Sequence, residues 1–175
     1  ENKIDMLEIK NLKIKLSEEL ENKSIIENAT FDMDKGEIIL LEGSNGSGKS
    51  SLLNVIFGNP KYTILSGEIL LDGKDITTLD TDEIARKGLY LAMQHAPEIA
   101  GVSTIKFLYR AYENVNKEEK KKSIVELKSF LEEKCELYGL DKTLLSRDTN
   151  VGFSGGEKKQ AELLHVLALA PNYVF

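Results

Sequence analysis

Hydrophobic and polar residues alternate in two stretches near the amino terminus. Residues 12–16 read LKIKL and residues 29–33 read ATFDM, and the polar stretch SEELENKS lies between them at 17–24. Alternation with a period of two is typical of strands that bury one face, and a polar stretch can turn the chain. We therefore predict an antiparallel pair of strands.

A continuously apolar segment comes next. The turn Asp34-Lys35-Gly36 leads into EIILLEG at 37–43, which is too apolar for a surface strand and predicts a buried strand of a parallel sheet. A helix from Lys49 to Phe57 follows, with Gly58 and Pro60 as stop signals.

The middle of the chain continues with short elements. GEILLDGKDI at 67–76 predicts a strand with an Asp72-Gly73 turn, and Asp80 with Glu83 can cap a helix that ends at Gly88. LYLAM at 89–93 predicts another buried strand.

The pattern becomes helical between residues 103 and 138. One apolar stripe with helical spacing contains Ile124, Leu127, Leu131, Cys135 and Tyr138. The fold class we expect is α/β, with a mostly helical middle.

Length and charge narrow the possible partners. A chain of 175 residues is long enough for one domain with a real core, and such a domain can hold an inserted subdomain. A formal net charge of -6 gives no broad electropositive field, so neither nucleic acid nor an anionic membrane is an expected partner. We find no apolar stretch of signal-peptide or membrane-spanning length, and Cys135 is the only cysteine in the sequence, which fits a reducing compartment. We expect a cytoplasmic protein without membrane insertion.

The strongest chemical signal is GSNGSGKSS at 43–51, between the predicted buried strand and a predicted helix. Gly-x4-Gly-Lys-Ser in that context is the phosphate-binding loop pattern, in which glycines let backbone N–H groups surround a phosphate. The lysine reaches the β- and γ-phosphates, and the serine after it ligates Mg²⁺. The alternative, a glycine-rich turn without a ligand, is disfavoured because motif and context agree. The candidate nucleotide-binding residues are Gly43, Ser44, Asn45, Gly46, Ser47, Gly48, Lys49, Ser50 and Ser51.

A second signal is GFSGGEKKQ at 152–160. Ser154 and Glu157 form a capping box pattern that is sufficient to start a helix. It does not explain Gly155 and Gly156 in the first turn, where each glycine costs about 1 kcal/mol relative to alanine. Glycines there let an anion approach bare N–H groups, so we predict a second phosphate site.

In their order, these motifs resemble those of the ABC ATPase family. The loop at 43–51 looks like Walker A, Gln94 after LYLAM like the Q-loop glutamine, and FSGGE at 153–157 like the signature motif. The resemblance implies ATP and Mg²⁺ as cofactors, with Ser50 and Gln94 near the metal and Gln94 near the attacking water. It also implies a transient head-to-tail dimer, in which Ser154-Gly155-Gly156 acts across the interface. The alternative is that Gln94 is an ordinary polar residue at the end of a strand, which its position alone does not exclude.

The resemblance also implies an architecture. It is a P-loop NTPase fold with a RecA-like core, an antiparallel β subdomain and an inserted helical subdomain. The core would comprise residues 1–94 and 158–175, and the helical subdomain residues 95–157, ending in the signature motif.

Three stretches resemble the SufC group of this family, the ATPases of SUF iron–sulfur cluster assembly. They are NPKYTILSGEILLDGKDIT at 59–77, MQHAPEIAGVS at 93–103 and LLSRDTNVGFSGGEKK at 144–159. Glu157 stands where transporter ATPases usually carry glutamine, and two lysines follow it. The resemblance implies that residues 95–112 help to dock scaffold subunits of the SufB/SufD type. The nucleotide-binding domain of an ABC transporter and a non-hydrolysing nucleotide-binding fragment remain open alternatives.

Other expectations concern individual positions and the end of the chain. His165 and Cys135 lie among apolar residues and are predicted to be core residues rather than metal ligands, and His95 completes no ligand set with them. No aromatic residue precedes Walker A between Leu7 and Thr30 to stack on adenine, so aliphatic side chains would carry the base and the choice between ATP and GTP stays open. The family's Walker B acids, D-loop and switch histidine would follow Phe175. We therefore expect residues 1–175 alone to be poorly stable and to hydrolyse little ATP.

Overall fold

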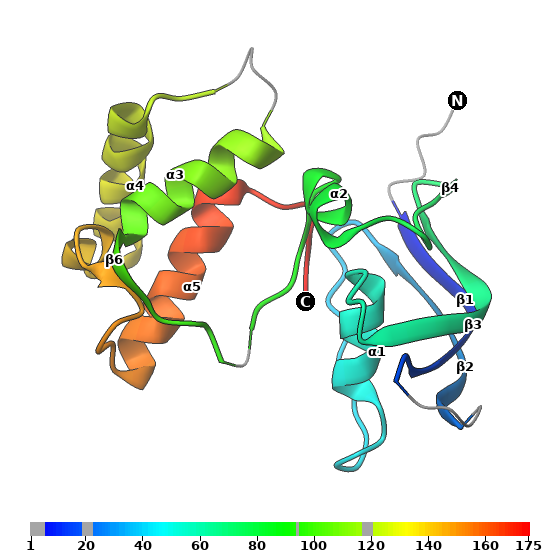
Figure 1. Cartoon of the computed structure of the whole chain (residues 1–175). Coiled ribbons are helices and arrows are strands. Elements are labelled where there is room, and N and C mark those ends of the chain that lie inside the picture. The colour runs from blue at the N-terminus through cyan, green and yellow to red at the C-terminus, as the bar shows by residue number, and fades with distance from the viewer. Residues whose placement is uncertain (1–5, 19–22, 94, 117–120) are drawn as a thin grey trace. The chain divides into compact units, whose positions relative to one another are not determined.

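The computed structural model describes residues 6–18, 23–93, 95–116 and 121–175 (Figure 1). The chain divides into two compact units: one runs to Ala85 and includes Phe175, and the other is Arg86–Val174. Among the described residues, no helix is both long enough and apolar enough to cross a membrane.

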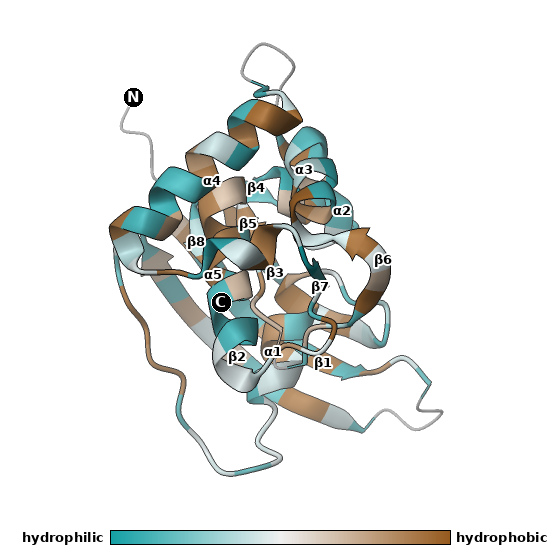
Figure 2. Ribbon diagram, turned by 90° about the vertical axis from the view of Figure 1, so that its left-hand side faces the viewer, coloured by the Kyte–Doolittle hydropathy of each residue, from teal (hydrophilic) through white to brown (hydrophobic). Residues whose placement is uncertain are grey.

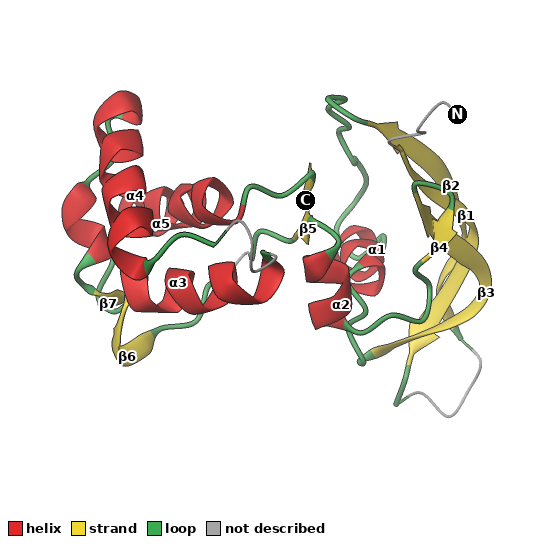
Figure 3. Cartoon of the chain, turned by 90° about the horizontal axis from the view of Figure 1, so that it is seen from above, coloured by secondary structure: helices red, strands yellow, loops and turns green. Residues whose placement is uncertain are grey.

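The first unit contains an antiparallel sheet in the order β2-β1-β3-β4 (Figure 3). Its strands are β1 (Met6–Leu16), β2 (Ser24–Asp34), β3 (Tyr62–Leu71) and β4 (Lys74–Asp75). The predicted antiparallel pair is confirmed, and the Asp72-Gly73 turn joins β3 to β4 as expected.

Strand β1 buries one face in spite of a change in its alternation. Its fully buried side chains are Leu7, Ile9, Leu12 and Ile14. The parity changes between Ile9 and Leu12, where the register shifts around Asn11, which has a φ of 49°. A bulge absorbs the additional residue, so that both apolar pairs face the core.

The predicted buried strand over 37–43 is wrong for this structure. These residues form no regular element, and Ile38 and Leu40 are 95% and 79% exposed. A strand needs a hydrogen-bonded neighbour, and no described strand pairs with this segment. An apolar run predicts burial only where a neighbouring strand is available to cover it.

Two short helices begin where the sequence predicted them. Helix α1 (Lys49–Ile56) ends at Phe57 and Gly58, where Gly58 has a φ of 65°. Helix α2 (Thr81–Arg86) begins after Asp80, whose N–H donates to Glu83 Oε2 at 3.1 Å.

The second unit is built on helices α3 (Thr104–Val115), α4 (Ile124–Tyr138) and α5 (Gly155–Leu169), with the 3-10 helix η2 (Lys142–Leu145). Two small pairs of strands accompany them: β6 (Ile99–Ser103) with β7 (Asp148–Thr149), antiparallel, and β5 (Leu89–Tyr90) with β8 (Tyr173–Val174), parallel. The predicted strand over 89–93 therefore forms only at its first two residues, and Met93 is 58% exposed.

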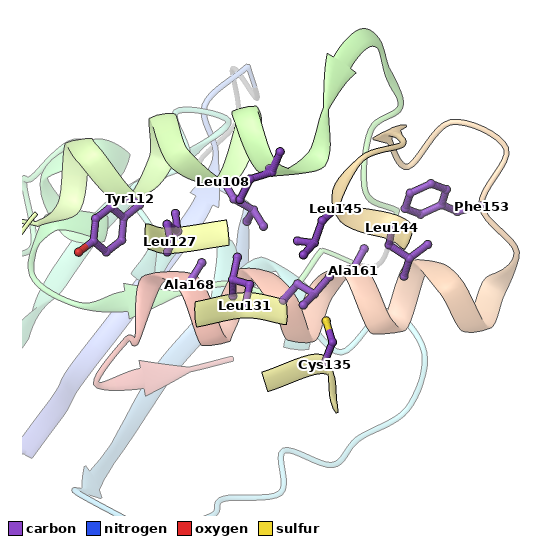
Figure 4. Packing of buried hydrophobic residues seen from close by; sticks show 12 residues of the cluster. Leu108, Tyr112, Leu127, Leu131, Cys135, Leu144, Leu145, Phe153, Ala161 and Ala168 are labelled. Carbon is purple, nitrogen blue, oxygen red and sulfur yellow. The ribbon is translucent and has the colours of Figure 1, made fainter. Parts of the chain in front are cut away.

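The helices share one hydrophobic cluster, and Figure 4 shows its side chains converging. Leu127, Leu131 and Cys135 of the predicted stripe are buried in it, which confirms Cys135 as a core residue. The ends of that stripe differ from the prediction, because Ile124 and Tyr138 are exposed. Figure 2 shows hydrophilic and hydrophobic residues mixed along α4 and α5, as expected for helices with one buried face. The division into a nucleotide-binding core and an inserted helical subdomain stays a prediction.

Candidate functional site

The loop at 43–51 leads directly into the amino terminus of α1. Gly48, the residue before the helix, has a φ of 94°, and a Cβ there would lie 3.0 Å from Ile26 Cγ1. Both the left-handed backbone and the crowding by β2 favour glycine at this position. Gly46 has a φ of 82° but nothing within 4 Å of an added Cβ. The loop therefore has one glycine held against the sheet and another in open space.

Lys49 lies over this loop. Its Nζ donates to Gly43 O at 2.7 Å and to Ser44 O at 2.8 Å, and it lies 3.5 Å from Ser47 Oγ. The ammonium group is thus held by the loop's own carbonyl oxygens. The first turn of α1, all of which is described, carries no acidic residue. A lysine charge and the positive end of a helix dipole combine here, so the loop is suited to an anion.

The serines after Lys49 lie in the first turn of α1. Ser50 is exposed and Ser51 is half-buried. The Ser50 carbonyl accepts a hydrogen bond from Asn54 Nδ2 at 2.7 Å, which leaves its hydroxyl outside that contact. A hydroxyl oxygen is a ligand of the kind that Mg²⁺ accepts.

The predicted capping box at the start of α5 is formed. Ser154 Oγ accepts from Glu157 N at 3.2 Å, and Glu157 Oε2 accepts from Ser154 N at 2.7 Å. Gly155 and Gly156 are exposed, and an added Cβ would meet nothing within 4 Å at either position. Crowding within this chain therefore does not require glycine at either position.

Arg147 is a residue that the sequence did not single out. Its Nη1 donates to Glu157 Oε1, and its guanidinium lies 4.5 Å from the centre of the Phe153 ring. The hydrogen bond from the Ser154 N–H, followed by the one from Arg147, lowers the pKa of Glu157. The two partners lie ten positions apart in the sequence, and no periodic pattern indicates such a pair.

Gln94 lies outside the described residues. The segment after it, with α3 and α5, borders a cavity of about 330 Å³ inside the second unit. Its lining includes Met93, Pro97, Ile99, Phe107, Ala111 and Lys158. Lys158 also forms an ion pair with Glu98 at 3.1 Å, which ties the start of α5 to this segment.

His165 and Tyr90 also line this cavity. Tyr90 Oη lies 3.3 Å from His165 Nδ1, and the Phe107 ring lies 5.6 Å from the imidazole. Burial raises the pKa of Tyr90 to about 12 and lowers the pKa of His165, because it disfavours the charged form of each group. His165 is half-buried and borders a cavity, so it is less enclosed than a core residue. Among the described residues, no group of His, Cys, Asp and Glu could hold a metal ion.

The structure places the two predicted phosphate sites in different units. The loop at 43–51 belongs to the first unit and Ser154-Gly155-Gly156-Glu157 to the second. The helix predicted after each motif is formed, whereas the buried strand predicted before the loop at 43–51 is not. The binding roles of these residues stay predictions.

Comparison with known proteins places these motifs in one family. The model of the family described as ABC transporter matches residues 26–175. A "Probable ABC transporter ATP-binding protein" of Streptococcus pyogenes serotype M3 is 40% identical over 170 residues, which cover 97% of this chain and 65% of that protein. A "Probable ATP-dependent transporter ycf16" of Cyanophora paradoxa is 40% identical over 172 residues, with the same two coverages. The chain thus spans about 65% of the length of these curated relatives.

Solved structures show the same fold. The dimeric bacterial ABC transporter cassette MJ0796 matches with a TM-score of 0.77 at 21% identity, over 96% of this chain and 72% of that one. The ATP-binding cassette MJ1267 matches with a TM-score of 0.72 at 22% identity, over 97% and 67%. The predicted α/β fold of a P-loop ABC ATPase is confirmed.

Proposed function

The chain belongs to the ABC transporter family, and we propose that the protein is an ATP-binding and ATP-hydrolysing subunit that drives iron–sulfur cluster assembly on a SUF scaffold. The observation that carries the nucleotide part is the loop at 43–51, with Lys49 held over it by the carbonyls of Gly43 and Ser44. Family membership supports ATP as the nucleotide and Mg²⁺ as its metal.

In this proposal, Lys49 exchanges its carbonyl partners for β- and γ-phosphate oxygens when ATP binds. The loop N–H groups and the amino terminus of α1 stabilise the remaining charge. Ser50 would help to hold Mg²⁺, and the metal would supply Lewis-acid neutralisation of the phosphate charge. Gln94, by the family resemblance, would orient the attacking water. Low activity of residues 1–175 by themselves stays a prediction.

We further propose that two copies act head to tail. Ser154, Gly155 and Gly156 of one copy would then meet the γ-phosphate that the other copy holds at Lys49. The exposure of both glycines supports this role, because exposed N–H groups at the amino terminus of a helix are suited to an anion. The matching cassette MJ0796 is described as a dimer, which fits the same arrangement.

The SUF assignment depends on the sequence of the signature region and of the stretch after Gln94. Glu157 with Lys158 and Lys159 replaces the glutamine usual in transporters. Residues 95–112 would help to dock scaffold subunits of the SufB/SufD type, and the apolar lining of the adjacent cavity supports a protein partner there.

The second candidate is the nucleotide-binding subunit of a membrane transporter. The names of the relatives from Streptococcus pyogenes and Cyanophora paradoxa favour it. It would use the same phosphate-site residues and dock a permease through the same segment.

A pull-down of the tagged protein from its native host separates the two functions. Wild-type protein should co-purify with soluble scaffold subunits, and a charge reversal in the docking segment, Lys106→Glu, should reduce their recovery, because Lys106 is exposed on α3. Lys74→Glu, on an exposed residue of β4, is the matched control. Recovery of integral membrane proteins in place of scaffold subunits would replace the SUF assignment with the transporter one.

A further inference from the structure

The start of α5 carries an unfavourable charge for the role proposed above. Glu157 lies in the first turn of the helix, and its side chain is 26% exposed. A triphosphate that approaches Gly155 and Gly156 would meet this carboxylate within the same helical turn. Like charges at such short range repel, by an amount that solvent and salt reduce. A glutamine at this position would carry no such charge.

Arg147 supplies the compensating charge. Its guanidinium binds Glu157 Oε1, while Glu157 Oε2 accepts the Ser154 N–H at 2.7 Å. Both carboxylate oxygens therefore accept hydrogen bonds from other groups of the protein. The guanidinium also lies on the face of Phe153, which is buried in the helical cluster and fixes its position.

The main chain of Arg147 is anchored as well. Its carbonyl oxygen accepts from Thr104 N at 2.9 Å and from Thr104 Oγ1 at 3.2 Å, and Thr104 is fully buried at the start of α3. The neighbouring Asp148 accepts from Gly101 N at 2.7 Å. Arg147 thus reaches Glu157 from a fixed backbone, and a fixed backbone lowers the entropy lost in forming the ion pair.

We propose that Arg147 is a positioning residue for the signature motif: it neutralises Glu157 and holds the capping box closed, so that the amino terminus of α5 can accept a nucleotide phosphate bound to a second copy of the protein. This inference rests on the proposed head-to-tail function. Arg147 itself contacts Glu157 and not the nucleotide.

The alternative role for Arg147 is to stabilise the folded protein and nothing more. Pairs of this kind at a partly exposed surface contribute little to folding stability, because solvent screens them. The two roles differ in what the loss of Arg147 changes. Structural support predicts a lower unfolding midpoint, whereas positioning predicts weaker nucleotide-dependent dimerisation at nearly unchanged stability.

The test uses the full-length protein as its host makes it. The variants are Arg147→Met, Arg147→Lys, Glu157→Gln and the double variant Arg147→Met with Glu157→Gln. Lys128→Met is the matched control, because Lys128 forms an exposed ion pair with Glu132 on α4 at 3.6 Å, outside both proposed binding regions. Sedimentation velocity with Mg²⁺ and a slowly hydrolysed ATP analogue measures dimerisation at low and high salt. Calorimetry on the dilute monomer measures nucleotide affinity, and circular dichroism measures unfolding.

We expect Arg147→Met to weaken nucleotide-dependent dimerisation about tenfold, the size of one lost charge-assisted contact, and to leave monomer nucleotide affinity unchanged. Arg147→Lys should recover part of the loss. The defect should shrink at high salt, since repulsion between the free carboxylate and the triphosphate is then screened. In the Glu157→Gln background, Arg147→Met should have no further effect. Lys128→Met should behave as wild type.

Two results would overturn the inference while the proposed function stands: dimerisation of Arg147→Met equal to wild type, or a defect that persists at high salt and in the Glu157→Gln background. If Arg147→Met does not fold, Arg147→Lys decides the question by the same comparison in the two backgrounds. Absence of any nucleotide-dependent dimer in the wild type would overturn the head-to-tail function, and this inference with it.

Discussion

Two glycines of the phosphate loop share a left-handed backbone and differ in their surroundings. Gly48 has Ile26 and Ile25 within 3.4 Å of an added Cβ, whereas Gly46 has nothing within 4 Å. Gly48→Ala should therefore cost more stability than the roughly 1–2 kcal/mol that a left-handed alanine costs by itself. Gly46→Ala should cost about that amount and no more. Urea unfolding of both variants measures the difference, and equal losses would mean that β2 does not constrain the loop.

Lys49 is the residue on which nucleotide binding should depend most. Its ammonium is positioned by loop carbonyls that a phosphate would replace, and charge-assisted contacts contribute about 1.5–3 kcal/mol. We expect Lys49→Ala to weaken Mg²⁺-ATP binding roughly 10- to 100-fold in calorimetry, with the unfolding midpoint nearly unchanged. Lys74→Ala, on an exposed lysine of the same unit, is the control. A Lys49→Ala protein that binds ATP as tightly as wild type would contradict the proposed site.

At residue scale, the sequence predicted those features that are local. The Gly48-Lys49-Ser50 string and the Ser154–Glu157 box are read from short spacings, and the structure gives each its expected local geometry. Arg147 was not predicted, because its contact with Glu157 depends on how the loop between them folds. The box of Ser123 with Glu126 at the start of α4 was also missed, although the same spacing could have located it.

Helix α4 offers a matched pair of leucines at the scale of a single element. Leu131 is fully buried in the helical cluster, and Leu137 is 65% exposed. Leu131→Ala should cost about 2–5 kcal/mol in the free energy of unfolding, because the cavity it leaves loses packing contacts as well as transfer energy. Leu137→Ala should stay within about 0.5 kcal/mol of wild type. Urea unfolding followed by circular dichroism gives both values, and similar losses would contradict the observed orientation of α4.

The contact of helix α5 with β5 should make stability depend on pH. Burial lowers the pKa of His165 beside Tyr90, against a smaller opposing effect of Glu162. The unfolded chain then binds a proton more readily than the folded one, so stability is fully present above the ordinary histidine pKa of about 6.5. It should fall as the pH drops from there toward the folded pKa. Urea unfolding at pH 7.5 and 5.5 should show this loss in the wild type and a smaller one in His165→Gln.

The elements also show where sequence patterns lose their power. The alternation in β1 and β2 predicted the antiparallel pair, since a half-buried strand carries its own signature. The run at 37–43 predicted a strand that is not formed, because apolarity carries no information about which neighbour is present to pair. The bulge at Asn11 was equally hidden, because it appears only when β1 is aligned with its partners.

At the scale of the whole molecule, the loop at 43–51 and the signature motif belong to separate units, and the proposed function brings them together between two copies. Lys49→Ala removes one half of each composite site, and Gly156→Asp removes the other by placing a carboxylate where a phosphate should approach. Neither variant alone should dimerise with Mg²⁺ and an ATP analogue. An equal mixture should form heterodimers, because the loop of the Gly156→Asp copy and the signature of the Lys49→Ala copy make one intact site.

Sedimentation of the separate and mixed variants measures this outcome directly. The matched mixture of Lys49→Ala with a second, differently tagged Lys49→Ala protein should stay monomeric, because nucleotide binding is weakened in both copies. Recovery of dimers only in the complementary mixture requires that each nucleotide be bound by two different chains. Had the two motifs met within one chain, mixing would restore nothing, since each chain would keep its own defect. Complementation therefore tests the head-to-tail arrangement independently of the partner that the protein serves.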